Sequence, residues 1–373
     1  MHIRPFGVEI WMNRYENECE LNLAETCVDS LTVSQLLELA GKGNAGLDEL
    51  LPMRLSYGAI EGSDRLRNAI ASLYDKQSPT NVVVTHGAIG ANALIYQTLV
   101  EPADRVVSVL PNYQQHYSIP ESLGAEVRVL RLREEDGYLP DLDELKRLVG
   151  SQAKLIALTN PNNPTGALIE RPMLEAIAAI ARDAGAWVLC DEVYRGVDQH
   201  GDGFTASMAD LYEKGISTGS MSKAWSLAGL RLGWIAAPEE IIHAVSIHRD
   251  YNTISVGMVD DYLASLALES RDRVLERSRA ITRGNLAILD QWIAGEPLIT
   301  YVRPRSGTTA LLKYDLPISS EEFCTRLLEA TGVMLLPGSA LDMEGHLRIG
   351  YANNSDILRE GLARMSGFLR TFA

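Results

Sequence analysis

Lys223 is the residue of this sequence whose neighbours point most directly to chemistry. Two hydroxyl side chains, Ser220 and Ser222, precede it, and Arg231 follows eight positions later. A lysine that can lose its proton forms a Schiff base with an aldehyde, and hydroxyl and guanidinium groups can bind a phosphate on the same ligand. Among common cofactors, pyridoxal phosphate needs both. The segment therefore predicts a pyridoxal-phosphate site, although lysines in hydroxyl-rich turns are also common on protein surfaces.

The order of these residues carries a resemblance to a known family. The pattern S-x-S-K followed by G-x-R-x-G resembles the cofactor-lysine motif of the class I and II aminotransferases, which are fold type I pyridoxal-phosphate enzymes. The resemblance implies that Lys223 is the catalytic lysine and that Ser220, Ser222 and Arg231 bind the cofactor phosphate. It runs over nearly the whole chain, because further motifs follow in the family's order.

Two of these motifs follow predicted strands. The run 159–166 matches the family motif N-P-x-N-P-T-G, which implies that Asn163 donates a hydrogen bond to the phenolic oxygen of the cofactor and borders the substrate. Asp191 ends the next strand, and a buried carboxylate needs a cationic partner such as a protonated pyridine nitrogen. By resemblance, Tyr194 places its hydroxyl on the same phenolic oxygen. The alternative is that Asp191 caps a turn.

Phosphate binding also involves the loop after the first predicted strand. The stretch 85–90 lies between a strand and a helix, where free amide groups can bind an anion. Gly87, Ala88 and Ile89 are the residues that the resemblance places on the phosphate. Tyr57 matches a family tyrosine that reaches the phosphate of the neighbouring subunit, which implies a homodimer with shared active sites. Read without the family, Tyr57 is a loop aromatic.

Two further residues are assigned by the resemblance. Tyr113 corresponds to an aromatic ring that stacks on the pyridine, for which a flat apolar face is sufficient. Its alternative role is to close a hydrophobic cluster. Arg348 corresponds to the arginine that binds the α-carboxylate of the substrate, and a guanidinium fork suits a carboxylate through two parallel hydrogen bonds.

The elements that must position these residues follow from the hydrophobic pattern. Short β-branched runs alternate with helical segments, which is typical of parallel strands joined by crossover helices. The predicted strands are 81–85, 105–110, 126–130, 154–159, 186–190, 215–218 and 232–236, and helices are expected at 63–75, 91–100, 170–184 and 238–249. A long charged helix through 270–277 is expected after about residue 259. In open α/β sheets, ligands bind beyond the carboxyl ends of the strands.

The predicted fold is therefore α/β, and the resemblance makes it the fold type I of pyridoxal-phosphate-dependent transferases. We expect a large cofactor-binding domain over 46–270, built on a mainly parallel seven-stranded sheet. Residues 1–45 and 271–373 are expected to form a smaller α+β domain. The length of 373 residues and the 46% hydrophobic composition suit two cores.

Composition excludes several other classes. A net charge of −15 argues against nucleic-acid and anionic-membrane partners. The four cysteines lack the spacing of a zinc site or a disulfide framework, which fits a reducing cytoplasm and predicts no metal. No signal peptide and no apolar run of membrane-spanning length is present, so a cytoplasmic protein is expected.

The predicted function is transfer of an amino group from an L-amino acid to a 2-oxo acid through a Schiff base at Lys223. After an amino acid displaces the lysine, the freed amine acts as general base on the α-proton. The first alternative is an oxygen-dependent oxidase or a cyclase that acts on arginine or hydroxyarginine. A non-catalytic pyridoxal-phosphate regulator is the distant alternative, because the chain offers no basic DNA-binding segment.

Substrate choice is where the sequence departs from the common family pattern. Many relatives carry a G-x-P-D-type turn near the start, and here the stretch 21–30 contains Glu25 and Asp29 instead. These carboxylates could face a cationic substrate end, or they could cap a solvated loop. Segments 249–255 and 305–310 are similar to the subgroup that contains capreomycidine synthase. Oxidases related to that subgroup carry a histidine near this turn, where the present sequence has Cys27.

Overall fold

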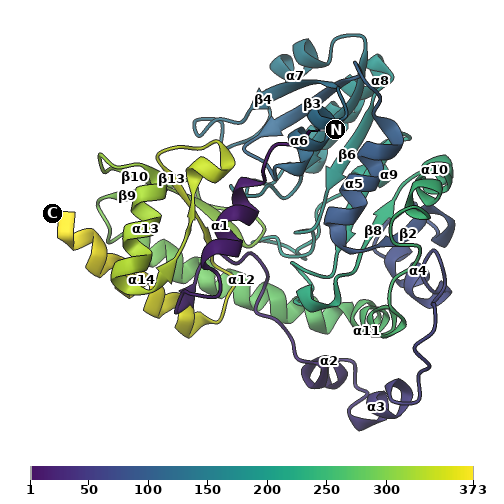
Figure 1. Ribbon diagram of the computed structural model, residues 1–373, viewed down its shortest axis with the longest axis horizontal. Helices are drawn as coiled ribbons and strands as arrows, with labels where there is room; N and C mark the ends of the chain where they lie inside the picture. The colour runs from purple at the N-terminus through teal and green to yellow at the C-terminus, as the bar shows by residue number, and fades with distance from the viewer. Residues whose placement is uncertain (1, 373) are drawn as a thin grey trace.

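A seven-stranded sheet forms the centre of the computed structural model, which describes residues 2–372 (Figure 1). Strand β8 is antiparallel to both of its neighbours, and the other adjacent pairs are parallel. Every predicted strand is present, with ends that differ by at most a few residues. In sheet order the strands are β2 (Val82–Thr85), β8 (Gly233–Ala236), β7 (Gly215–Ser220), β6 (Trp187–Asp191), β5 (Ala153–Thr159), β3 (Arg105–Leu110) and β4 (Glu126–Arg131).

Helices cover both faces of this sheet, which explains why its strands are apolar runs rather than alternating patterns. Along β5, Ile156 packs with α7 (Leu142–Val149) and α8 (Arg171–Ala184). The next residue, Ala157, points to the other face, toward α5 (Gly87–Leu99) and α10 (Glu239–Arg249). Helix α6 (Gln115–Ser122) and the short helix α9 (Met208–Leu211) complete these layers.

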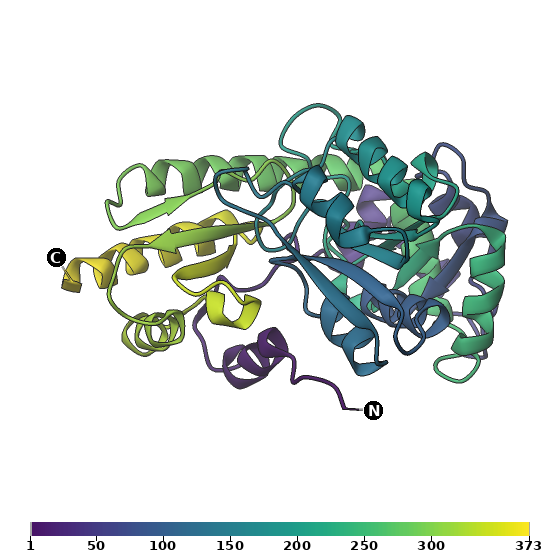
Figure 2. The same ribbon diagram turned by 90° about the horizontal axis from the view of Figure 1, so that it is seen from above.

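Three predicted helices differ from the observed ones. The helix expected at 91–100 is α5, which begins earlier, at Gly87. The helix expected at 63–75 is α4 (Asp64–Ala71), and tight turns follow it. The charged helix expected after about residue 259 is two helices, α11 (Met258–Glu269) and α12 (Arg271–Ile293), because Ser270 takes φ −102° and ψ 23°. This bend sends α12 away from the large sheet and alongside the second one (Figures 1 and 2).

A second, antiparallel sheet of four strands lies beside the first (Figure 2). Its strand order is β12 (Leu336–Pro337), β13 (His346–Gly350), β10 (Thr309–Tyr314) and β9 (Ile299–Tyr301). A separate hydrophobic cluster joins this sheet to α1 (Gly7–Tyr15), α12, α13 (Ser320–Thr331) and α14 (Ser355–Leu369). Strands β1 (Leu21–Asn22) and β11 (Val333–Met334) pair in parallel as a separate two-stranded sheet.

The remaining amino-terminal helices pack elsewhere. Leu36 and Leu37 of α2 (Val33–Leu39) belong to the same cluster as α11, and α3 (Asn44–Leu50) follows at the periphery (Figure 1). The 3-10 helices are η1 (Pro79–Asn81), η2 (Ala228–Leu230), η3 (Gly338–Leu341) and η4 (Arg370–Phe372). Within residues 2–372, no helix is both long and apolar enough to cross a membrane.

Candidate active site

A cavity of about 520 Å³ lies where the carboxyl ends of β5, β6 and β7 face β13 and α1. The carboxyl ends meet at one edge because these strands run in the same direction. All predicted site residues except Tyr57 line this cavity: Glu25, Gly87, Ala88, Ile89, Tyr113, Asn163, Asp191, Tyr194, Ser220, Ser222, Lys223, Arg231 and Arg348. The tertiary structure thus gathers residues that are spread over most of the chain.

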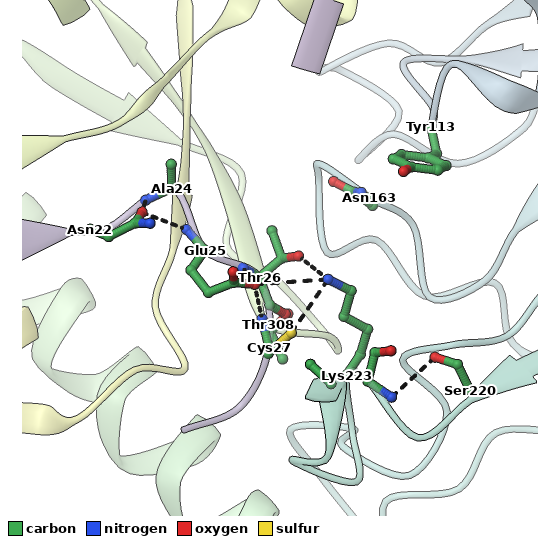
Figure 3. Close-up of polar contacts among 12 residues, drawn as sticks. Asn22, Ala24, Glu25, Thr26, Cys27, Tyr113, Asn163, Ser220, Lys223 and Thr308 are labelled. Atoms are coloured by element: carbon green, nitrogen blue, oxygen red, sulfur yellow. Dashed lines mark hydrogen bonds and ion pairs between the residues drawn. The ribbon is translucent and has the colours of Figure 1, made fainter. Parts of the chain in front are cut away.

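Lys223 follows β7 and extends toward the turn after β1 (Figure 3). Its Nζ donates a hydrogen bond to Thr26 Oγ1 at 2.6 Å and lies 3.6 Å from Cys27 Sγ. The Glu25 carboxylate oxygen Oε1 is 3.9 Å from the same nitrogen. Sequence reasoning named Glu25 but gave no site role to Thr26, which belongs to no recognisable motif.

These contacts determine the pKa of the Lys223 amine. Burial by itself lowers the pKa of Lys223, but negative charge on its neighbours, Cys27 first, raises that pKa overall. Burial raises the pKa of Cys27 to about 11, so the thiol is neutral near pH 7. Burial opposes ionisation of Glu25 as well, yet the charge of Lys223 and hydrogen bonds from the turn lower its pKa to about 2. Near neutral pH, Glu25 is therefore the ionised neighbour that stabilises the ammonium form.

Asp191, at the end of β6, is 4% exposed and is held by residues from two helices. Asn92 Nδ2 donates to Asp191 Oδ2 at 2.8 Å, and Asn92 is itself fixed by Thr218, whose Oγ1 donates to Asn92 Oδ1. His116 Nε2 lies 3.5 Å from Asp191 Oδ2 and has no hydrogen-bond partner within residues 2–372. His116 was missed from the sequence because it stands in a helix without a motif, and Asn92 was missed because it lies beyond the stretch 85–90 that the resemblance covers.

A buried carboxylate facing a cavity, with an orphan imidazole nitrogen beside it, fits a ligand that carries a protonated ring nitrogen. Pyridoxal phosphate carries this group. The chemistry of the donor set is thus consistent with the cofactor that the sequence predicts.

Another part of the cavity lining fits a phosphate. Helix α5 begins at Gly87, and its N-cap residue His86 makes no side-chain capping hydrogen bond. The first amides of a helix have no intrahelical partner and attract anions. A Cβ atom on Gly87 would lie 3.3 Å from a guanidinium nitrogen of Arg231, so the arginine packs directly on this turn. Ser220 and Ser222 add hydroxyl groups to the lining.

Arg348 enters the cavity from β13 and is 3% exposed. One terminal nitrogen donates to the carbonyl of Ala24 at 3.0 Å, and the other contacts Asn163 Oδ1 at 3.4 Å. Its Nε has no hydrogen-bond partner in the described part of the chain. A buried guanidinium with an unused donor is suited to a carboxylate ligand.

Two tyrosines complete the polar lining. Tyr194 is buried, and this burial raises the pKa of its hydroxyl above the ordinary value. Tyr113 donates from its hydroxyl to Glu9 Oε1 at 3.1 Å, and its ring lies across the cavity from Lys223 (Figure 3).

Helix α1 contributes an acidic face that sequence reasoning did not assign to the site. Glu9, Met12, Asn13 and Glu16 line the cavity at helical spacing. Of the two carboxylates considered in the turn 21–30, Glu25 lines the cavity, whereas Asp29 pairs with Arg277 at 3.0 Å and does not. The local sequence could not distinguish these two orientations.

Tyr57 lies outside the cavity and is 85% exposed. Other large apolar side chains are exposed in the same segment and in the turn after α10: Leu51, Leu55, Ile60, Tyr251 and Ile254. The predicted role of Tyr57 concerns a second subunit and stays a prediction. No cluster of three or more His, Cys, Asp or Glu side chains that could hold a metal ion occurs within residues 2–372.

Comparison with known proteins gives consistent results. Residues 32–364 match the family model described as aminotransferase class I and II. Capreomycidine synthase of Streptomyces vinaceus is 29% identical, covering 98% of this chain and 94% of the relative. Arginine–pyruvate transaminase of Pseudomonas aeruginosa is 28% identical, covering 86% and 84%. The crystal structure of a pyridoxal-phosphate-dependent aminotransferase from Streptococcus suis superposes with a TM-score of 0.97 at 41% identity, covering 100% of this chain and 99% of that one.

Proposed function

Since the chain is a pyridoxal-phosphate-dependent member of the class I and II aminotransferase family, we propose that it moves an amino group from an L-amino acid to a 2-oxo acid through a Schiff base at Lys223. The observation that carries this proposal is the convergence of Lys223, Asp191 and Arg348 on one cavity. A lysine amine, a buried carboxylate and a guanidinium at one site are the groups that amino-group transfer from an amino acid requires.

The chemistry that pyridoxal phosphate supplies when bound is an electron sink in conjugation with the substrate α-carbon. Asp191 would keep a proton on the ring nitrogen, and Asn92 holds that carboxylate in place. The first turn of α5, with Arg231, Ser220 and Ser222, would bind the phosphate. Asn163 and Tyr194 would donate hydrogen bonds to the phenolic oxygen, and Tyr113 would stack on the ring.

The substrate would be oriented by Arg348, whose Nε has no hydrogen-bond partner within residues 2–372 and would donate to the α-carboxylate. Lys223 would then remove the α-proton as general base and deliver it, within the same half-reaction, to the former aldehyde carbon of the cofactor.

A basic amino donor is favoured by the charge of the remaining lining. If Asp191 pairs with the ring nitrogen, the acidic groups left over are Glu9, Glu16 and Glu25. The amine of Lys223 would be bonded to the cofactor, and the positive charges of Arg231 and Arg348 would be paired with the phosphate and the α-carboxylate. The surplus negative charge suits a donor such as arginine with a cationic side chain.

The same observation supports the second candidate, an oxidase or a cyclase that acts on arginine or hydroxyarginine. Capreomycidine synthase is among the relatives, and its identity to this chain is similar to that of arginine–pyruvate transaminase. A non-catalytic regulator would not need the general base Lys223 beside an α-carboxylate site.

One experiment separates these candidates. The purified holoenzyme is mixed in air with a panel of L-amino acids that includes arginine, without a 2-oxo acid, while absorbance and dissolved oxygen are recorded. Stoichiometric conversion of the cofactor to pyridoxamine phosphate without oxygen uptake supports transamination. Oxygen consumption over many turnovers supports the oxidase, and turnover of hydroxyarginine without either signal supports the cyclase. A Lys223→Ala variant should lose the visible absorbance of the lysine-bound cofactor.

The exposed apolar surface around Tyr57 supports a homodimer with shared active sites. Sedimentation analysis tests the assembly, and a Leu55→Glu variant should shift it toward the monomer. A monomer that binds the cofactor with wild-type affinity would contradict the shared site.

A further inference from the structure

Thr26 makes the shortest polar contact of Lys223, at 2.6 Å, and it does so from a segment 197 positions away in the sequence. We propose that Thr26 is a positioning residue whose hydroxyl holds the amine of Lys223 beside the substrate whenever that amine is not bonded to the cofactor. The inference rests on the proposed function, because amino-group transfer requires Lys223 to be a free amine during part of the reaction.

The chemistry of the three neighbours singles out the hydroxyl. A carboxylate such as that of Glu25 accepts hydrogen bonds and therefore attracts the ammonium form of Lys223. A hydroxyl both accepts and donates, so Thr26 can bond the ammonium as acceptor and the neutral amine as donor. Cys27 is 3.6 Å away, and a thiol is a weak donor and a weak acceptor. Thr26 is thus the neighbour whose hydrogen bond can persist while the lysine gains and loses the α-proton.

The turn that presents Thr26 is fixed on several sides (Figure 3). Asn22 Oδ1 accepts the amides of Ala24 and Glu25, and Glu25 Oε1 accepts the amide of Thr26 at 2.6 Å. Thr308 Oγ1 donates to the carbonyl of Thr26, also at 2.6 Å. Thr26 is 6% exposed. These bonds hold the backbone of Thr26 on both sides of its side chain. A buried side chain on a fixed backbone has little freedom to lose when it binds the lysine, which is what precise positioning requires.

The same turn is bonded to the proposed substrate anchor. Arg348 donates to the carbonyl of Ala24 at 3.0 Å, two residues before Thr26. The amide of Gly350, on the same strand as Arg348, donates to the carbonyl of Leu23 at 2.7 Å. The turn therefore fixes the base and the carboxylate anchor relative to each other. That geometry determines whether the lysine reaches the α-proton.

The test is the half-reaction of the holoenzyme with the most reactive L-amino acid of the panel, in protiated and α-deuterated form. The variants are Thr26→Ser, Thr26→Val and Thr26→Ala, and the matched control is Thr309→Val. Thr309 is 1% exposed and its Oγ1 has no hydrogen-bond partner within residues 2–372, so its loss removes no bond.

We expect Thr26→Val and Thr26→Ala to slow the half-reaction by roughly 10- to 100-fold, the value for one hydrogen bond to a charged group. The deuterium isotope effect should rise, because proton transfer becomes more rate-limiting, while the amino-acid concentration for half-saturation stays unchanged. Thr26→Ser restores the hydroxyl and should react at close to the wild-type rate, as should Thr309→Val.

Two results would overturn the inference. One is a Thr26→Val or Thr26→Ala enzyme that matches Thr309→Val in rate and isotope effect. The other is a Thr26→Ser enzyme that is as slow as the alanine variant, which would indicate a purely structural role of the threonine methyl group. If the valine variant fails to fold, the comparison of Thr26→Ala with Thr26→Ser tests the inference. A wild-type holoenzyme that reacts with no amino acid would instead contradict the proposed function itself.

Discussion

Removal of the Glu25 charge provides a direct test of the electrostatics around Lys223. The substitution Glu25→Gln keeps an oxygen that accepts the amides of Thr26 and Cys27, and it changes the charge 3.9 Å from the lysine nitrogen. Two unit charges at 3.9 Å attract each other by roughly 1 kcal/mol in water and by about 4 kcal/mol at an effective dielectric constant of about 20.

The solvent exposure of the two side chains determines which of these two energies applies. The side chains are 25% exposed for Lys223 and 45% exposed for Glu25, so water screens the pair and the lower value applies. A contribution of about 1 kcal/mol corresponds to somewhat under one pKa unit. Because Glu25 raises the pKa of Lys223, its neutralisation should lower that pKa by somewhat under one unit.

The assay is capture of pyridoxal phosphate by the apoenzyme, followed by visible absorbance over a range of pH. The neutral amine of Lys223 is the reactive form. Ionisations of the free cofactor are the same for every variant, so the difference between the midpoints reports the lysine. Below the lysine pKa, Glu25→Gln should capture the cofactor up to about tenfold faster than the wild type.

The control is Glu38→Gln, which removes the same charge from an exposed position on α2 outside the cavity. It should leave the midpoint unchanged. A midpoint that moves upward in Glu25→Gln, or that moves equally in Glu38→Gln, would refute the assignment of the 3.9 Å contact as the source of the effect.

Three further perturbations test other parts of the structure. Arg348→Lys replaces a planar fork with a point charge and should raise KM for the amino donor by roughly 10- to 100-fold, measured by steady-state kinetics. Burial raises the pKa of Asp198 to about 6, so the ionised carboxylate destabilises the folded state above that pH. Asp198→Asn should therefore raise the free energy of unfolding by on the order of 2 kcal/mol above about pH 6. Urea titrations should show that this gain disappears below about pH 4. A Cβ atom on Gly350 would lie 1.6 Å from the carbonyl oxygen of Glu25, so Gly350→Ala should displace the turn and lower both Tm and cofactor retention; wild-type values for both would show that the strand and the turn are not in close contact.

The sequence by itself determined the large sheet and the part of the site attached to it. The strands are runs of Val, Ile and Leu buried on both faces, and their connections are crossover helices. Asp191 and Lys223 occupy positions at strand ends, where the parallel arrangement brings successive loops to one edge. Local pattern and motif order were sufficient for these residues because each is placed by the strand immediately before it.

Helix ends were determined less well. Residues 258–293 form two helices because Ser270 departs from helical dihedrals, and the helical pattern continues across that residue without an obvious break. The direction of α12 depends on which cluster its apolar side chains join, and this is a tertiary property.

Only the tertiary structure decided what surrounds the functional groups. Thr26 and Glu9 reach the site from a turn and a helix that carry no motif, and Thr26 contacts Lys223 across 197 positions. Asn92 reaches it from α5, beyond the stretch 85–90 that the resemblance covers. Glu25 faces the cavity whereas Asp29 pairs with Arg277, although both belong to the same short segment. The physical reason is that the end of a strand determines the position of the residue that follows it. The orientation of a loop side chain, in contrast, depends on packing and charge contributed from distant parts of the chain.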